Sequence, residues 1–408
     1  MPVLVEDRGG IVALLLVSLF FHGTWPALVT LLERRGRLPQ HTYLDYSITN
    51  LLAAIIMALT LGQAGESTNG TPKFFSQVAQ DNWPSVLFAM AGGIALGLAN
   101  LLLQYAFAFL GLSVTTVIFT CLVAVTGTTM NYFLDGRINR AAILFPGVGC
   151  FLIAALLGSV VHASNVKDDK DKLSMSGIQS CPKGTNNCFA VMMVHHPEEL
   201  ENGHGRALST ISQAEVGTAE FVIQVEERRS IKVFGSDKLL GIGLVLLSTV
   251  CASICSVASN LATNDQWHTL MNGVPHLVVY TAFFYFSMSC FALGVCLNVL
   301  FLYRPMAGVP ASSIGAYVRD WNGRHWALLS GLLCGFGNGF QFMGGQAAGY
   351  AAADSVQALP LVCTFWGVVL FGEYRRSSMK TYILLVGMLS MFVAAVVLLI
   401  ASAGHRKT

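Results

Sequence analysis

Asp354 is the residue with the clearest capacity for chemistry, because it is a carboxylate within a long apolar stretch. It follows three alanines and precedes Ser355 and Gln357. A carboxylate inside a membrane span costs at least about 2.5 kcal/mol, so it usually faces a cavity or a polar partner. Such a group can take up and release a proton, which makes Asp354 a candidate for proton coupling. The alternative is that it caps a helix at the mouth of a tight hairpin.

A second acidic candidate, Asp45, opens another apolar stretch. Asp45 and Thr49 are one helical turn apart, as are Tyr46 and Asn50, so each pair would share a helix face. Asp45 either takes part in proton coupling or pairs with nearby arginines. The nearest in sequence are Arg34, Arg35 and Arg37. Asn50 lies deeper in the stretch, and we expect it to face a cavity and contact substrate.

The first apolar stretch contains a potential helix break near its middle, at His22-Gly23-Thr24-Trp25-Pro26. Pro26 has no N–H, so the carbonyl of His22 loses its helical partner. Gly23 permits local unwinding. Backbone groups freed in this way can line a polar cavity, and His22 and Trp25 would then contact a substrate. The alternative is an ordinary proline kink that a neighbouring helix satisfies.

Amide side chains recur on two glycine-rich stretches. Asn100 and Gln104 share a helix face on the first, and Asn338 and Gln341 lie close together on the second. Small residues let helices approach closely, and amides hydrogen-bond across such contacts. An amide both donates and accepts hydrogen bonds, which suits a planar ring with C=O and N–H edges. We expect these four residues to contact either a neighbouring helix or a substrate of that kind.

These side chains must be positioned by membrane-spanning helices. The chain of 408 residues is 54% hydrophobic and only 11% charged, whereas a soluble domain has about 25% charged residues. Apolar runs of about 20 residues, the length that crosses a bilayer, recur along it. The sequence predicts an all-α integral membrane protein with ten transmembrane helices. The predicted spans are 10–32, 42–62, 84–109, 112–134, 140–162, 238–260, 276–303, 326–348, 351–372 and 379–403.

One long polar stretch separates the first five spans from the last five. It has too little apolar surface to fold alone. We expect a first five-helix repeat in 1–162, a central loop in 163–237 and a second five-helix repeat in 238–408. Cys181 and Cys188 in the loop fit no zinc-binding pattern, so no metal site is expected. The net charge of +2 argues against a nucleic-acid partner.

Lys and Arg are unevenly distributed among the predicted loops. Most of them fall in loops that follow odd-numbered spans, the central loop included. Because cytoplasmic loops are enriched in Lys and Arg, we expect the central loop in the cytosol and both termini on the outer side. The N-terminus carries Glu6 and Asp7 rather than a basic region, which indicates a retained first span and not a cleaved signal.

Spans three to five match spans eight to ten at one constant offset in residue number, without a gap. The matched pairs are Gly93 with Gly331, Gly97 with Gly335, Asn100 with Asn338, Gly111 with Gly349 and Asp135 with Glu373. Each half has an odd number of spans, so the second half enters the membrane from the opposite side. Inverted repeats are typical of secondary transporters, whose halves rock around a site near the midplane. The pattern therefore favours a transporter over an enzyme.

Five long blocks support a more specific interpretation. They are GTWPALVTLLERRGRLPQHTYLDYSITN (23–50), QDNWPSVLFAMAGG (80–93), NYFLDGRIN (131–139), GTAEFVIQVEERRSIKVFG (217–235) and GFGNGFQFMGGQAAGYAAADSVQALPLV (335–362). These blocks resemble the plant ureide permease family, which belongs with the ten-span drug/metabolite-type carriers. The resemblance implies proton-coupled import of ureides such as allantoin and of other oxo-derivatives of nitrogen heterocycles, such as uracil and xanthine-like rings. It also implies the plasma membrane or an internal membrane of a plant cell.

The alternative function is transport of sugars or nucleotide sugars by a carrier of the related ten-span superfamily. Nucleotide sugars are anionic and would require Lys or Arg in the spans, which contain almost none. The sequence therefore favours a small neutral heterocyclic substrate. The other expected partners are protons and the lipid bilayer, and no nucleic acid is expected.

The chain departs from the resembled family at a Walker-A-like run at the end of the central loop. The run begins at Ser230 and reads Gly235-Ser236 where the family has Gly-Lys. A phosphate cradle needs that lysine, so we expect no ATP binding. No cofactor is expected, and the proton gradient would supply the driving force.

Overall fold

The protein is a bundle of long helices. The computed structural model describes residues 8–64, 72–175, 228–231, 238–264 and 274–403. Every regular element in these residues is a helix, and nine are long and apolar enough to cross a membrane. The nine are α1 (Arg8–Arg34), α2 (Pro39–Leu59), α4 (Trp83–Leu110), α5 (Leu112–Leu134), α6 (Ala141–Met175), α9 (Lys238–Thr263), α10 (Val279–Tyr303), the segment Tyr350–Phe371 and α15 (Met379–Ala401). The prediction of an all-α membrane protein is confirmed.

A tenth long helix, α12 (Arg324–Ala348), coincides with the predicted eighth span. Its Gly, Asn and Gln residues lower its hydropathy, and it is not among the nine helices that are apolar enough to cross a membrane. It nevertheless packs against both α1 and α2 within the bundle. Two short helices, α3 (Phe74–Val78) and α11 (Ile314–Arg319), lie in connections between long helices.

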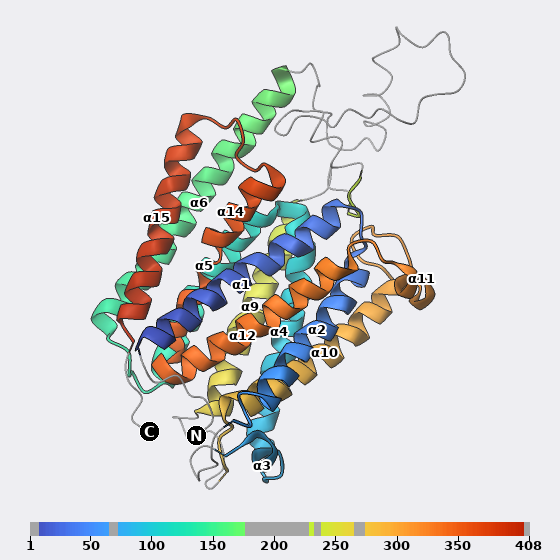
Figure 1. Ribbon diagram of the computed structural model, residues 1–408. Coiled ribbons are helices and arrows are strands. Elements are labelled where there is room, and N and C mark those ends of the chain that lie inside the picture. Colours follow the sequence, from blue (N-terminus) through green and yellow to red (C-terminus); the bar gives the residue numbers. More distant parts are fainter. Residues whose placement is uncertain (1–7, 65–71, 176–227, 232–237, 265–273, 404–408) are drawn as a thin grey trace.

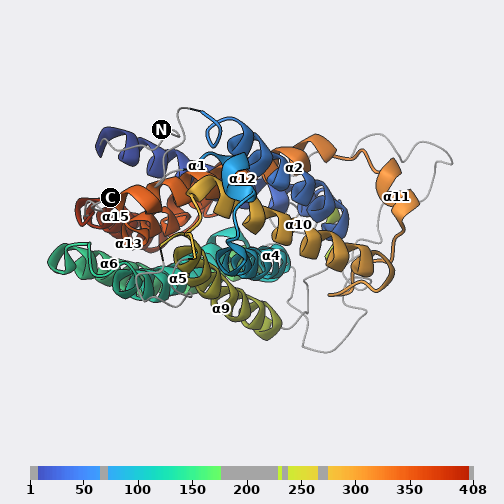
Figure 2. The ribbon, with the colours of Figure 1, turned by 90° about the horizontal axis from the view of Figure 1, so that it is seen from below.

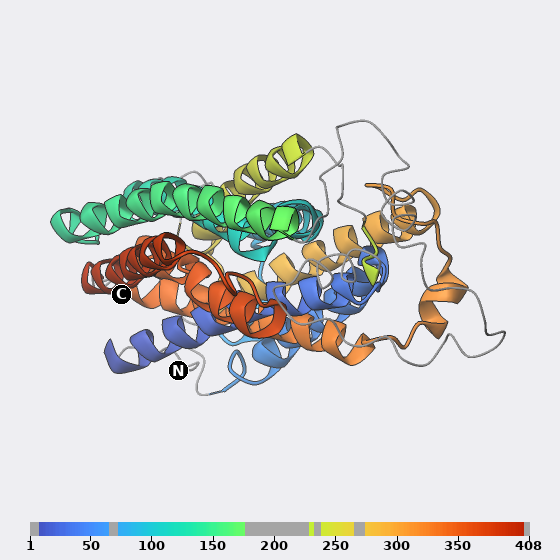
Figure 3. The same cartoon turned by 90° about the horizontal axis from the view of Figure 1, so that it is seen from above.

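The long helices run side by side (Figure 1). Seen from below and from above, α6 and α9 lie on one side of the bundle, and α1 lies on the other (Figures 2 and 3). The closest neighbours come from different halves of the chain: α4 packs along α9, α1 along α12, and α6 along α15. The core therefore lies where the two halves meet.

Glycines set the closest helix contacts. A Cβ atom placed on Gly93 of α4 would overlap the backbone oxygen of Phe286 in α10. One placed on Gly331 of α12 would overlap the backbone oxygen of Tyr46 in α2. Any larger residue at these two positions would force the helices apart, so both glycines have the packing role expected of small residues in a membrane bundle.

The first span is continuous, so the expected break near His22 is wrong. α1 remains helical through Pro26. Its Gly23 instead allows close contact with α14 (Pro360–Phe371), where the thiol of Cys363 lies 3.2 Å from the Gly23 carbonyl oxygen. α1 is thus helical along this contact although the proline removes one backbone hydrogen bond.

The broken helix is the predicted ninth span. α13 (Tyr350–Ala353) follows Gly349, whose φ of +90° is readily adopted only by glycine. A 3-10 turn, η1 (Asp354–Gln357), comes next, and α14 begins at Pro360. Pro360 has no N–H and cannot continue helical hydrogen bonding from the preceding turn. Asp354 therefore lies at a break within a segment of membrane-spanning length.

Candidate functional site

An internal cavity of about 90 Å³ lies among α1, α4, α5, α9, α12 and the broken ninth span. Its polar lining includes His22, Asn100, Thr116, Ser256, Asn338, Gln341, Asp354 and Gln357. Its aromatic lining is Trp25, Phe107, Phe119, Phe342 and Tyr350. Among the described residues, neither Lys nor Arg contributes to this lining. The lining is mainly apolar and aromatic, and its polar groups are neutral apart from one carboxyl.

His22 is hydrogen-bonded through both ring nitrogens. Its Nδ1 lies 3.0 Å from the carbonyl oxygen of Ser18, and its Nε2 lies 3.1 Å from Oδ1 of Asn338. The Ser18 hydroxyl donates to the carbonyl of Gly337 at 2.7 Å. The imidazole therefore links α1 to α12 at the wall of the cavity.

Two amides from different helices meet near Cys334. Asn338 Nδ2 lies 3.4 Å from Cys334 Sγ, and Asn100 Nδ2 donates to the hydroxyl of Tyr46 at 2.9 Å. That hydroxyl lies 2.9 Å from the same sulfur. The ring of Trp25 packs on Tyr46 with centroids 5.5 Å apart. Polar groups of α4 and α12, flanked by an indole, thus form one side of the cavity.

Asp354 reaches the cavity from η1, and only 3% of the residue is exposed. Its Oδ2 accepts a hydrogen bond from Nδ2 of Asn131, on α5, at 3.2 Å. Asn131 also lies 2.7 Å from the Ser256 hydroxyl and accepts from Asn260 at 3.1 Å, both on α9. A neutral amide, held by α9, thus positions the carboxyl.

The cavity brings together most of the residues chosen from the sequence. Its lining includes His22, Trp25, Asn100, Asn338, Gln341 and Asp354. Asn50, Gln104 and Asp45 do not belong to it. Asn50 is buried and donates to the Tyr46 hydroxyl at 3.3 Å, and Gln104 is buried as well.

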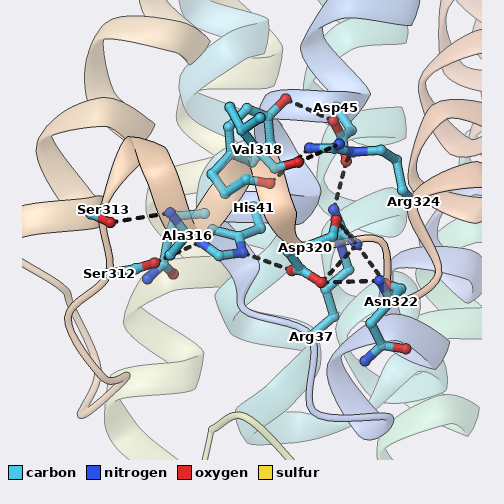
Figure 4. Close-up of polar contacts among 12 residues, drawn as sticks. Arg37, His41, Asp45, Ser312, Ser313, Ala316, Val318, Asp320, Asn322 and Arg324 are labelled. Carbon is cyan, nitrogen blue, oxygen red and sulfur yellow. Dashed lines mark hydrogen bonds and ion pairs between the residues drawn. The ribbon is translucent and has the colours of Figure 1, made fainter.

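Asp45 is held by an ion-pair network between the start of α2 and the segment around α11 (Figure 4). Arg37 Nη2 lies 2.6 Å from Asp45 Oδ2, and Arg324 Nε lies 3.2 Å from the same oxygen. Tyr317 donates to Asp45 Oδ1 at 2.7 Å. Two effects raise the pKa of Tyr317 to about 12: burial of its phenol, which is the larger, and the hydrogen bond to the Asp45 carboxylate. This geometry favours the ion-pair interpretation of Asp45 over proton coupling.

Sequence reasoning missed Thr116, Ser256 and Gln357, which also line the cavity. Thr116 carried a usable signal, because it aligns with Asp354 at the same offset that pairs Asn100 with Asn338. Ser256 and Gln357 carried no such sequence signal, since polar residues of these types often only form hydrogen bonds between helices.

Several predicted features fall outside the described residues. Of the Walker-A-like run, Ser230 is described, whereas Gly235 and Ser236 are not. The Ser230 N–H donates to the Glu33 carbonyl at 3.2 Å. Cys181 and Cys188 also lie outside. Within the part of the chain that the structure covers, no cluster of three His, Cys, Asp or Glu is arranged to hold a metal ion.

The sequence closely matches proteins of one transporter family. A family model described as Ureide permease matches residues 42–402. Ureide permease 2 and Ureide permease 1 of Arabidopsis thaliana are 60% and 58% identical over 404 residues, which cover 99% of this chain and 100% of each relative. Probable ureide permease A3 of Vigna unguiculata is 56% identical over 383 residues, covering 93% of this chain and 100% of that protein.

Long apolar helices around a cavity with several polar side chains in its lining, together with these relatives, define the class: a multi-pass membrane transporter and not an enzyme. The chain belongs to the ureide permease family. The resemblance noted from the sequence blocks is thereby confirmed.

Proposed function

We propose that this protein carries small neutral ureides, and related oxo-derivatives of nitrogen heterocycles, across a membrane together with protons. Allantoin, uracil and xanthine-like rings are substrates of this class. The observation that carries the proposal is the internal cavity, whose described lining offers amides, hydroxyls, an imidazole and a carboxyl but neither Lys nor Arg. The names of its relatives, Ureide permease 1 and 2, point to the same class.

The cavity lining suits a neutral ring better than an anion. Asn100, Asn338 and Gln341 each present a donor and an acceptor, which match the C=O and N–H groups of a ureide. Trp25 and Phe107 offer aromatic faces to a planar ring. A nucleotide sugar would need Arg or Lys near its phosphates, so it fits this lining poorly.

We further propose that the ten long helices form two inverted five-helix repeats. Matched hydrogen bonds between the halves support this arrangement. The Ser18 hydroxyl donates to the carbonyl of Gly337 at 2.7 Å, and the Ser248 hydroxyl donates to that of Ala99 at 2.9 Å. Ala99 and Gly337 directly precede Asn100 and Asn338, so they are equivalent positions of the sequence repeat. The first helix of each half thus contacts the third helix of the other half in the same way.

A second matched pair relates other helices. The Thr49 hydroxyl on α2 donates to the carbonyl of Leu328 on α12 at 2.7 Å. The Ser289 hydroxyl on α10 donates to that of Met90 on α4 at 2.8 Å. Met90 and Leu328 are again equivalent positions at the constant offset of the repeat. Ser and Thr hydroxyls also make such contacts between unrelated helices, so the hydrogen bonds alone do not indicate a repeat. The constant offset between the accepting residues is what favours common ancestry.

The ends of the two halves also correspond. Glu373, after α14, accepts from Arg34 at the end of α1 at 3.4 Å. Asp135, after α5, accepts from Asn264 just past α9 at 2.9 Å. The ends of α1 and α9 lie at opposite ends of the bundle (Figure 1), as inverted repeats require. In a rocking mechanism these two contacts would close the cavity from opposite sides in turn.

Asp354 is the residue that we propose for proton coupling. It is the carboxyl of the described cavity lining, and a neutral amide holds it. A proton taken up by this carboxyl removes a negative charge from the chamber that holds the substrate. Proton binding and substrate binding would then change each other's affinity, which is what coupling requires.

The proposed organisation comprises a repeat in 1–162, a cytosolic central loop in 163–237 and a repeat in 238–408. Both termini would lie on the outer side, and the plasma membrane is the proposed location, with an internal membrane as the other option. The enrichment of Lys and Arg in the odd-numbered loops supports this orientation.

Uptake of radiolabelled allantoin by a yeast strain that lacks its own allantoin permease tests the proposed function. Expression of the protein is expected to raise uptake above the empty-vector level, with competition by unlabelled uracil and loss of uptake after addition of a protonophore. Uptake that stays at the vector level for allantoin, uracil and xanthine would refute the proposal.

A further inference from the structure

We infer that His22 and Asn338 form a proton-dependent recognition pair, in which protonation of the imidazole reverses the orientation of the Asn338 amide. The inference rests on the proposed function and adds a second proton-responsive group to the same cavity. The two side chains come from α1 and α12, both line the cavity, and they are joined by a contact of 3.1 Å between Nε2 and Oδ1.

The hydrogen-bond partners of His22 determine which ring nitrogen has a variable proton. Nδ1 lies 3.0 Å from the backbone oxygen of Ser18, which can only accept. The Ser18 hydroxyl lies 3.2 Å from the same nitrogen but already donates its proton to the Gly337 carbonyl. Nδ1 therefore carries hydrogen in both states, and the exchangeable proton is the one on Nε2, which faces Asn338.

Each protonation state of His22 selects one orientation of the amide. When Nε2–H is present, it donates to Oδ1 of Asn338, and the amide NH2 points to Cys334 Sγ at 3.4 Å. When Nε2 is bare, it accepts, so the NH2 must turn to it and the amide oxygen then faces the thiol. The thiol can donate to that oxygen, so both arrangements satisfy every group and differ only by a rotation of the amide.

This rotation changes what the cavity offers to a substrate. Beside its contact with the Cys334 thiol, the Asn338 amide has a second N–H on the side away from His22 in one state and a second oxygen lone pair in the other. A ring with fixed C=O and N–H positions fits only one of them, because an unmatched buried polar group loses its hydrogen bond. A proton on Nε2 would therefore set the affinity for substrate, and its departure on the other side of the membrane would promote release.

The surroundings of His22 contain few other groups that could account for such pH dependence. The titratable groups that line the cavity with His22, or that contact Cys334 or Gly23 beside it, are Tyr46 on α2, Cys255 on α9, Cys334 on α12, Tyr350 on α13, Asp354 on η1 and Cys363 on α14. Asp354 is the carboxyl among them, and the described cavity lining contains neither Lys nor Arg. The experiment must therefore separate His22 from Asp354.

The test measures the KM and the maximal rate of allantoin uptake between external pH 5.5 and 7.5. In the wild-type protein, KM is expected to rise about fivefold over this range, the effect of one mispaired hydrogen bond. In His22→Gln, which keeps a polar side chain but cannot titrate, KM is expected to stay constant while the maximal rate still falls with rising pH through Asp354.

A matched control is His41→Gln. His41 is also hydrogen-bonded through both nitrogens, to Asp320 at 2.7 Å and to Ser312 at 2.8 Å, but it lies outside the cavity. This variant is expected to keep the wild-type dependence of KM on pH. If KM in His22→Gln follows pH as in the wild type, or if the wild-type KM does not change with pH, the inference is wrong although transport itself stands.

A second measurement covers the case in which His22→Gln does not transport. Allantoin binding to purified protein in nanodiscs is measured at pH 5.5 and 7.5 for the wild type, His22→Gln and Asn338→Leu. Both variants are expected to lose the pH dependence of Kd that the wild type shows. A wild-type-like pH dependence in Asn338→Leu, which retains His22 but not the amide, overturns the inference. Absence of allantoin transport and binding in the wild type would instead contradict the proposed function.

Discussion

At the residue scale, the contrast between Asp354 and Asp45 shows how the surroundings of a carboxylate determine its use. Asp45 lies against Arg37, whose side chain has 0% exposure, and against Arg324. Asp354 has a neutral amide partner, Asn131, and lines a cavity. A carboxylate held by two guanidiniums belongs to an ion-pair network, which suits a structural role. A carboxyl without such a counter-charge is the better candidate for reversible protonation.

Replacement of Asp354 by Asn tests this assignment. The variant keeps the size of the side chain but cannot release a proton. We therefore expect accumulation of allantoin to be lost and the maximal rate of residual exchange to be insensitive to external pH between 5 and 8, whereas KM still changes with pH through His22. Asp320→Asn is the matched control, because Asp320 is a carboxyl outside the cavity that contacts His41 and Arg37. A wild-type pH dependence of the maximal rate in Asp354→Asn would remove the coupling role.

At the scale of the helices, glycine positions decide which surfaces meet. Gly331 of α12 lies against the backbone of Tyr46 in α2, and Gly93 of α4 lies against Phe286 in α10. Backbones at this distance leave no space for a side chain, so the amides and hydroxyls of adjacent turns reach across the contact. The same contacts position Asn100 and Asn338 at the cavity.

Substitution Gly331→Ala is expected to destabilise the protein by about 1–3 kcal/mol, because the new methyl group must displace the α2 backbone. The measurement is the midpoint of thermal unfolding of the purified protein in detergent, which should fall by several degrees. Gly243→Ala on α9 is the matched control, since a Cβ there meets nothing within 4 Å and alanine favours the helix. Equal midpoints for the two variants would contradict the packing role of Gly331.

The sequence predicted the long helices and much of the cavity, but it placed the helix break in the wrong span. Hydrophobic runs identify spans because the bilayer requires them, and the spacing of Asn100 and Asn338 identified two amides that line the cavity. Gly23 with Pro26 has the same local signature as a real break, but α1 is helical throughout. Its Gly23 packs against Val362 of α14, far along the chain, and local sequence cannot reveal such a contact.

At the scale of the molecule, the closest contacts join the two halves of the chain, as in α1 with α12 and α4 with α9. The hydrogen bonds of Ser18 and Ser248 correspond at these two contacts. We propose that the halves are inverted repeats that move against each other. In that arrangement the loops after even-numbered spans face outward and those after odd-numbered spans face the cytosol.

Labelling of single cysteines tests the proposed topology. In a cysteine-free background that still transports, Gln80→Cys and Ala311→Cys place single thiols at exposed positions beside α3 and α11. These two short helices lie toward opposite ends of the bundle (Figure 1). A membrane-impermeant maleimide added to intact cells is expected to label Gln80→Cys at once and Ala311→Cys only after permeabilisation. The opposite pattern would reverse the proposed orientation, and labelling of both in intact cells would contradict the inverted repeat.

Coupling of substrate movement to proton movement is the central claim, and proton flux in proteoliposomes measures it most directly. Purified protein is reconstituted with a pH-sensitive dye inside the vesicles and without an imposed gradient. External allantoin is expected to acidify the lumen as it enters, uracil to do the same, and a nucleotide sugar to have no effect. Entry of radiolabelled allantoin without any change of internal pH would contradict the account.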